Sequence, residues 1–321
     1  MMIYALGTLS RSGIEPFPAV VQDGMVLPLG LLLEEAPASL GAVFADWQRF
    51  GPEIDSAMAS PPSSGWRPEA DFAIHLPFMP GQLFGAGANY RKHVIDIIVI
   101  KGTPGTEDLS PDERRAWGAK FMDKRAATGL PFIWVGLHSA IAGSHDTLIL
   151  PRDVSQPDWE LELAVVIGKA ARRVPLDRAL EHVAGYTIAN DITARELVDR
   201  PDVPQMGMDW MRCKSAPGFN ILGPYVTPAR FVPDPQKLHI DLRVNGQVMQ
   251  DEGTDDMIFC VARLIEFISH HTQLNPGDVI MTGSPSGNGI HHGRMLRDGD
   301  VMTGEIVGLV GRQVTPCKEE G

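Results

Sequence analysis

Two glutamates stand at the start of an apolar segment, where their spacing suits metal binding. Residues 157–168 read Pro-Asp-Trp-Glu-Leu-Glu-Leu-Ala-Val-Val-Ile-Gly, so Glu160 and Glu162 alternate with leucines before a β-branched run. This pattern predicts a strand entering the core, on which residues i and i+2 share a face roughly 7 Å apart. Two like charges there repel each other and are costly to desolvate, and a hard divalent cation with oxygen ligands would offset that cost. A solvated strand end with two exposed carboxylates is the alternative.

Two further polar residues are candidates for the same site. Residues 186–189 read as a strand that ends at Asn190-Asp191, where Asp191 is a candidate third oxygen ligand. Lys214 follows downstream. Beside three carboxylates it would relieve charge or hold a substrate oxygen, and away from them it is an ordinary surface lysine.

A histidine and an aspartate form a candidate proton-transfer pair. His93 and Asp96 are three residues apart and follow a small-residue segment, 83–89, whose glycine spacing does not match a dinucleotide-binding loop. If the chain is helical after Asn89, the two side chains share a face and can hydrogen-bond. A carboxylate that orients an imidazole raises its basicity, as a general base requires. A surface His–Asp pair is the alternative.

A loop of glycine, serine and proline is a candidate anion-binding element. Residues 283–289 read Gly-Ser-Pro-Ser-Gly-Asn-Gly and expose backbone N–H groups that can hold an oxyanion or a carboxylate, although most such loops are simple turns. The pairs 270–271 and 291–292 are both His-His. Adjacent histidines on a strand face opposite ways, so we predict a structural role for both pairs.

Composition excludes several classes of function. The chain has 321 residues, of which 44% are hydrophobic and 21% charged, so it can bury a substantial core. Its net charge of −12 argues against a nucleic-acid partner. It has no apolar run long enough to cross a membrane, and its start does not resemble a secretory signal. Three scattered cysteines suit a reducing cytoplasm and do not form a zinc motif.

Turn and helix signals divide the chain into two parts. The first part has a hairpin around Asp23-Gly24, a helix capped by Ser39, and a Pro/Ser/Gly-rich linker at 51–70. We therefore predict a small domain with its linker over 1–70 and a larger domain over 71–321. In the larger domain, 111–128 reads as a helix, and the segment 101–130 is either a mobile lid or an inert excursion. A hairpin is predicted at Asn245-Gly246, and an apolar-striped helix opening at 255–256.

Taken together, these segments resemble the fumarylacetoacetate hydrolase family from about residue 80 to about residue 312. Five motifs carry the resemblance, in the family's order: 87–93, 158–168, 185–196, 214–215 and 276–289. The resemblance implies an α+β, mostly β fold with a mixed β-roll, and a homodimer. It implies that Glu160, Glu162 and Asp191 bind Mg²⁺ or Mn²⁺, with Ca²⁺ as a substitute. It also implies a general-base dyad of His93 and Asp96. The residues implied to face substrate or metal are Arg91, Arg195, Lys214 and Ser284.

The chain departs from the family pattern at several positions near the implied site. Asp96 stands where the dyad acid is commonly Glu, Gly136-Leu137 where many members have Lys-Pro, and Val198 where some have a carboxylate-binding glutamine. Ser284 replaces the usual Thr. These lost polar contacts argue against a short dicarboxylate such as oxaloacetate and favour a larger or less charged substrate.

We therefore predict a metal-dependent hydrolase that cleaves a C–C bond in a β-diketone or acylpyruvate-like substrate. The reaction would pass through a metal-stabilised enolate, with a water activated by His93 and Asp96. A decarboxylase, lyase or isomerase of a 2-oxo acid would use the same site. A non-catalytic binding protein that retains the fold is the second alternative.

Overall fold

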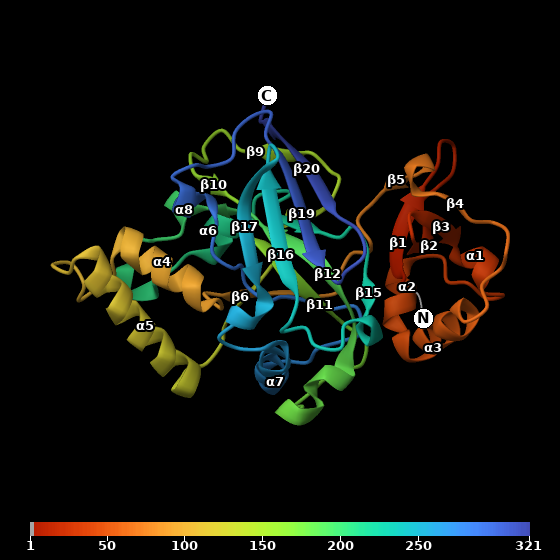
Figure 1. The fold of residues 1–321 in the computed structure, drawn as a ribbon, viewed down its shortest axis with the longest axis horizontal. Coiled ribbons are helices and arrows are strands. Elements are labelled where there is room, and N and C mark those ends of the chain that lie inside the picture. The colour runs from red at the N-terminus through yellow and green to blue at the C-terminus, as the bar shows by residue number, and fades with distance from the viewer. Residues whose placement is uncertain (1–2) are drawn as a thin grey trace.

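The computed structural model describes residues 3–321, and its N-terminal part forms a distinct lobe beside a larger body (Figure 1). The lobe contains a five-stranded sheet in the order β4-β3-β2-β1-β5. Its strands are β1 (Ala5–Ser10), β2 (Phe17–Gln22), β3 (Met25–Pro28), β4 (Arg67–Pro68) and β5 (Ala73–Ile74). Its helices are α1 (Leu29–Leu32), α2 (Leu40–Ala45) and α3 (Trp47–Met58).

The local signals of this lobe are mostly confirmed. Asp23 and Gly24 both have positive φ, 50° and 70°, in the β2–β3 turn, as a tight hairpin requires. The Ser39 hydroxyl accepts the N–H of Ala42 at 3.2 Å and caps α2. The linker predicted at 51–70 is wrong over its first part, because that part belongs to α3, which accommodates Pro52. The sheet continues to β5, slightly beyond the predicted boundary at residue 70.

Two curled sheets form the larger body. The larger sheet has the order β7-β6-β18-β11-β12-β14-β8, with β15 paired to β12. Its strands are β6 (Leu83–Gly87), β7 (Phe132–Val135), β8 (Ile141–Gly143), β11 (Leu161–Ile167), β12 (Val183–Asp191), β14 (Asn220–Leu222), β15 (Thr227–Pro228) and β18 (Val279–Met281). Most pairs are antiparallel, whereas β6–β18 and β8–β14 are parallel. The body is therefore the mixed-sheet, mostly β architecture that the sequence predicted.

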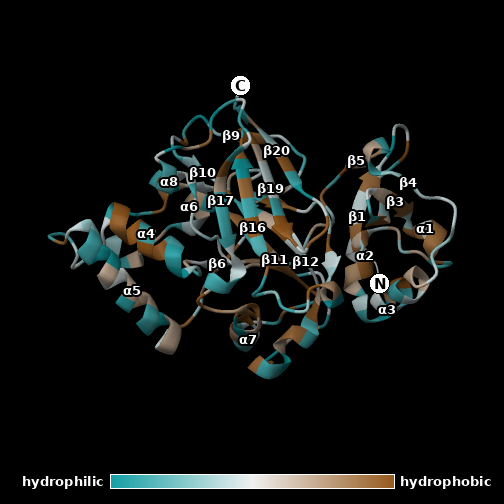
Figure 2. Cartoon of the chain, viewed as in Figure 1, coloured by the Kyte–Doolittle hydropathy of each residue, from teal (hydrophilic) through white to brown (hydrophobic). Residues whose placement is uncertain are grey.

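The second sheet has the order β17-β16-β19-β20-β9 and covers one face of the first. Its strands are β9 (Leu148–Leu150), β16 (His239–Val244), β17 (Gln247–Gly253), β19 (Val301–Val307) and β20 (Gln313–Glu319). Asn245 and Gly246, with φ of 52° and 81°, form the predicted hairpin turn between β16 and β17. Along β16, buried hydrophobic residues alternate with more exposed polar ones (Figure 2), as expected for a strand with one face on the core. A short ribbon joins β10 (Pro157–Asp158) to β13 (Thr193–Ala194).

Strand β11 is buried on both faces, and this burial explains its apolar sequence. Leu161, Leu163, Val165 and Ile167 pack in the core that also contains residues of β16 and β19. On the opposite face, Ala164 and Val166 belong to a second core, which includes residues of the N-terminal lobe. A strand covered on both sides reads as a continuous hydrophobic run.

Five helices complete the body: α4 (Arg91–Lys101), α5 (Pro111–Thr128), α6 (Trp210–Lys214), α7 (Val261–His271) and α8 (Gly289–His292). The predicted cap of α5 is confirmed, because Ser110 and Glu113 form a capping box. The helix predicted from residue 255 starts only at Val261, since 254–256 form a separate 3₁₀ turn. None of the helices in residues 3–321 combines the length and the hydropathy that crossing a bilayer requires.

Candidate metal centre and active site

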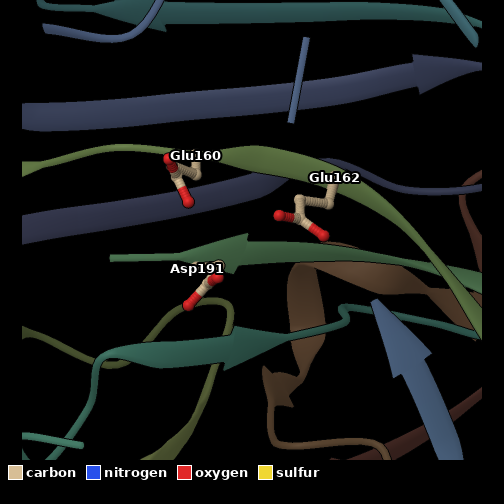
Figure 3. Close-up of side chains that lie close together, drawn as sticks. All are labelled: Glu160, Glu162 and Asp191. Atoms are coloured by element: carbon tan, nitrogen blue, oxygen red, sulfur yellow. The ribbon is translucent and has the colours of Figure 1, made fainter. Parts of the chain in front are cut away.

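Three carboxylates meet on one face of the large sheet because of the β11–β12 register. Glu162 lies opposite Ala189, and residues directly opposite each other in an antiparallel pair share a face. Asp191, two residues after Ala189, and Glu160, two before Glu162, therefore lie on that face as well. All three are buried, and one carboxylate oxygen from each lies within 4.8 Å of the others. Figure 3 shows the side chains turned toward one another from the two strands.

Two cations, Lys214 and Arg195, neutralise part of the acidic cluster, which we define as Asp158, Glu160, Glu162 and Asp191. Arg195 donates from Nε to Asp158 at 2.8 Å and from Nη2 to Glu160 at 2.6 Å. Lys214 Nζ donates to Glu160 at 2.8 Å and also to Asp191. With all side chains ionised, four carboxylates and two cations leave a net charge of −2. Arg195 and Lys214 therefore lie beside the carboxylates, and their predicted role of facing substrate or metal stays a prediction.

Glu162 is the carboxyl group of the cluster that lacks a cationic partner in residues 3–321. Its carboxylate accepts the N–H of Gly283 at 2.7 Å, and no Lys or Arg of residues 3–321 forms a salt bridge with it. Burial, together with Asp191 and Glu160, raises the pKa of Glu162 well above its ordinary value. Burial alone would also raise the pKa of Glu160, but Lys214 and Arg195 hold it below its usual range.

The donor set fits a divalent cation. Three carboxylate oxygens provide the hard ligands that Mg²⁺, Mn²⁺ and Ca²⁺ prefer, and a double positive charge matches the excess of the cluster. Asn220 Nδ2 donates to Asp191 Oδ1 at 3.2 Å and orients this carboxylate from the neighbouring strand. Glu160, Glu162 and Asp191 are the residues that would hold the ion.

The predicted hydrogen bond between His93 and Asp96 is not formed in residues 3–321. Asp96 instead accepts from Arg115 Nη1 at 2.9 Å and from the Ser286 hydroxyl at 2.8 Å. A guanidinium from α5 is a stronger partner for this carboxylate than a neutral imidazole. His93 is buried near the cluster. Burial lowers its pKa to about 3, although the negative charge of Glu160 acts to raise it. The ring is therefore neutral and able to accept a proton; its role as general base stays a prediction.

The remaining two predicted substrate contacts lie in different surroundings. Arg91 is exposed and pairs with Asp123 of α5 at 2.8 Å. Ser284 is buried, and its hydroxyl accepts from Gln250 Nε2 at 2.8 Å and from Asn288 Nδ2 at 3.2 Å. The first contact ties α4 to α5, and the second braces the 283–289 loop. A direct contact of either residue with substrate remains a prediction.

The family is decided by a match over most of the chain. Residues 82–315 match the family model described as fumarylacetoacetate (FAA) hydrolase, C-terminal. The chain belongs to the fumarylacetoacetate hydrolase family. This match covers the large sheet, the acidic cluster, and the helices α4 and α8.

Relatives in this family are named for different reactions. Oxaloacetate tautomerase FAHD2A, mitochondrial, from Bos taurus is 40% identical over 178 residues, 55% of each chain, so the present chain spans about half the length of that relative. A probable 2-hydroxyhepta-2,4-diene-1,7-dioate isomerase from Mycobacterium abscessus has a TM-score of 0.74 at 27% identity over all of both chains. A fumarylacetoacetate hydrolase from Exiguobacterium antarcticum has a TM-score of 0.73 at 27% identity, over 99% of this chain and 100% of its own.

Several residues of the family site were missed by sequence reasoning. Asp158 belongs to the motif at 158–168, but no local signal marks a role for it. It is fully buried and accepts the backbone N–H groups of Gly289 and Ile290 as well as Arg195. Gln250 is buried on β17 and reaches both Ser284 and the N–H of Leu161. No local signal marks such a glutamine. His291 was predicted on a strand but lies in α8, with its ring against His93.

We expect metal binding to release protons and to weaken as pH falls. Burial, opposed by Lys214, raises the pKa of Asp191 to about 7 in the metal-free protein, and Glu162 is raised further above its ordinary value. A cation binds only the ionised carboxylates, so protons compete with it. Between pH 8 and pH 5 the apparent affinity for Mn²⁺ should fall by up to about tenfold per pH unit for each proton displaced. Titration calorimetry in buffers of different ionisation enthalpy measures the number of protons released on Mn²⁺ binding. An affinity that does not change with pH would contradict the assignment of Glu162 and Asp191 as metal ligands.

Proposed function

We propose that the protein is a divalent-metal-dependent hydrolase that cleaves a C–C bond in an acylpyruvate or β-diketone through an enolate. The observation that supports this most is the acidic cluster, with two more carboxyl groups than cations, next to a buried, neutral His93. A bound Mg²⁺ or Mn²⁺ would act as a Lewis acid on the two oxygens of a 1,3-dicarbonyl or a 2-oxo acid. Family membership supports the enzyme class, and the specific reaction is our proposal.

The residues of the site have separable roles in this reaction. His93 accepts a proton from water as the water oxygen bonds to the distal carbonyl carbon. The backbone N–H groups of Ser284 and Ser286 would hold the oxyanion of the adduct, because the other N–H groups of the 283–289 loop already donate to protein side chains. Cleavage of the C–C bond yields a carboxylic acid and a pyruvate enolate, and the protonated His93 returns its proton to the enolate carbon. Atoms and charge balance with one water consumed.

The surroundings of Lys214 support a substrate with an apolar part. Its Nζ lies 5.3 Å from the ring centre of Trp134 and 5.5 Å from that of Trp210, so aromatic surface borders the cluster. Gly136-Leu137 provides no lysine at this edge. These features favour an acylpyruvate over a short dicarboxylate.

A tautomerase or isomerase is the second candidate, favoured by the names of two relatives. It needs the same base but adds no water, because His93 would remove a proton from one carbon and return it elsewhere. A decarboxylase would release CO₂ instead. A non-catalytic binding protein would convert none of these compounds.

A turnover screen with product identification tests the proposal. The purified protein is assayed with acylpyruvates, β-diketones and oxaloacetate, with Mg²⁺ or Mn²⁺ and after chelation. We expect metal-dependent conversion of an acylpyruvate to pyruvate and a carboxylic acid, with one ¹⁸O from labelled water in the acid. Conversion of keto to enol forms without ¹⁸O uptake would favour the tautomerase. Full activity after chelation would refute the metal assignment.

The proposal includes a homodimer in the cytoplasm. The edge strand β7 exposes Phe132 and Val135, an apolar edge of the kind that association covers. All three cysteines are free, which suits a reducing compartment. Sedimentation of the purified chain measures its oligomeric state. Microscopy of the tagged full-length protein in its own cells determines the compartment.

A further inference from the structure

His291 is held in one tautomer by the loop that precedes it. Its Nδ1 accepts the backbone N–H of Gly287 at 2.8 Å and that of Asn288 at 3.1 Å. A nitrogen that accepts two such bonds carries no proton. Burial lowers the pKa of His291 to about 4, so the ring is neutral near pH 7. Its single proton therefore resides on Nε2, which makes Nε2 a hydrogen-bond donor.

This donor is buried without a partner, and it lies beside His93. In residues 3–321, His291 Nε2 is shielded from solvent and forms no hydrogen bond, whereas the side chains of His93 and Asn288 lie close enough to each other to pair. The rings of His93 and His291 meet edge to face, with centroids 5.2 Å apart and planes at 76°. A buried polar atom without a partner costs about 1–3 kcal/mol. An unpaired donor against the ring of His93 indicates a site built for a polar ligand.

The two histidines belong to the acidic cluster's surroundings. The charges of Glu160 and Arg195 act on the pKa of both rings, so both lie close to the residues that would hold the cation. Asp96 reaches the same place by way of Ser286, whose hydroxyl lies 3.4 Å from His291 Nδ1. The Ser286 hydroxyl donates its single proton to Asp96, so the acid predicted to serve His93 lies near His291 without a hydrogen bond to it.

We propose that His291 is a further catalytic residue, which donates its Nε2–H to the substrate oxygen that becomes negatively charged in the reaction. His291 keeps its proton throughout, and the hydrogen bond strengthens as charge develops on the oxygen. His93 remains the base, so the two imidazoles take complementary roles. The inference rests on the proposed function in one respect, namely that an enolate or an oxyanion forms.

A structural role for His291 would use only Nδ1, which caps the loop and α8. The two roles can be separated because asparagine can place an acceptor oxygen near the Nδ1 position but has no atom at Nε2. His291→Asn therefore keeps the loop contact and removes the donor, whereas His291→Ala removes both. His292 is exposed, lies in the same short helix, and bonds only to the carbonyl of Met249 at 3.0 Å. His292→Asn is the matched control.

We expect His291→Asn to lower kcat by about 10²-fold, the usual loss for one oxyanion donor, with Mn²⁺ affinity and melting temperature close to wild type. His291→Ala should lose kcat similarly and also lose stability, and His292→Asn should behave as wild type. A His291→Asn variant with wild-type kcat would overturn the proposal. Loss of Mn²⁺ binding together with kcat would overturn it too, because His291 would then act through the metal site.

A second measurement needs no variant and no turnover. Oxalate is a planar dianion that resembles the enolate of a 2-oxo acid, and it is added with Mg²⁺ to protein labelled with ¹⁵N in histidine. We expect the His291 Nε2 signal to move while Nε2 stays protonated. An unchanged signal, or a proton on Nδ1 in the free protein, would overturn the proposal. Should the wild type convert no substrate, the proposed function fails, and this measurement still decides whether His291 binds an anion.

Discussion

Replacing Glu162 by glutamine is expected to abolish divalent-metal binding and yet to stabilise the metal-free protein. Glu162 is the buried carboxylate of the acidic cluster with no salt bridge to a Lys or Arg in residues 3–321, and its pKa is raised well above the ordinary value by burial, Asp191 and Glu160. A neutral amide removes this penalty, which we expect to add about 1–3 kcal/mol to the free energy of unfolding. Calorimetry with Mn²⁺ measures the loss of binding, and thermal unfolding in chelator the gain in stability.

The sign of the stability effect depends on pH. A carboxyl group whose pKa is raised in the folded protein destabilises it above the unfolded pKa, which is about 4.3 for glutamate. The gain from Glu162→Gln therefore increases as pH rises from this value toward the raised pKa of the folded protein, and it vanishes at lower pH. A gain that persists in acid would point to a cause other than charge.

Glu160→Gln is the matched control and should have the opposite effect on stability. The Glu160 carboxylate accepts hydrogen bonds from Arg195 at 2.6 Å and from Lys214 at 2.8 Å. Its loss leaves Arg195 with Asp158 alone and Lys214 with Asp191 alone, which we expect to cost about 1–3 kcal/mol. Both variants should lose metal-dependent turnover. Retained metal binding in either, or equal destabilisation by both, would contradict the assigned charge distribution.

His93→Ala should lower kcat by about 10²–10⁴-fold, the range expected for loss of a general base, while Mn²⁺ still binds. His93 is buried and neutral, with its pKa lowered to about 3, and is not one of the three carboxylate ligands. The rate with a saturating acylpyruvate and the Mn²⁺ affinity by calorimetry separate the two effects.

His182→Ala is the control for this substitution. His182 is also buried, but its Nδ1 contacts the backbone of Lys169, outside the acidic cluster. We expect this variant to lose stability and keep its kcat. Loss of Mn²⁺ binding in His93→Ala would instead mean that His93 supports the metal site, and an unchanged rate would remove it from the mechanism.

The sequence by itself determined the elements with strong local signals. Alternation followed by a β-branched run identified β11, the Asp-Gly and Asn-Gly turns identified two hairpins, and the Ser110 cap identified α5. Period-two geometry also put Glu160 and Glu162 on one face. These features depend on residues close together in the chain, where backbone preferences act directly.

Only the tertiary structure decided how these elements meet, because the deciding contacts join distant segments. Asp96 is bound by Ser286, a residue 190 positions away, and by Arg115, so its expected bond to His93 does not form. His291 lies against His93 because α8 packs near α4. The strand order puts Asn220 beside Asp191. No local pattern encodes such pairings, since each depends on the packing of whole sheets and helices.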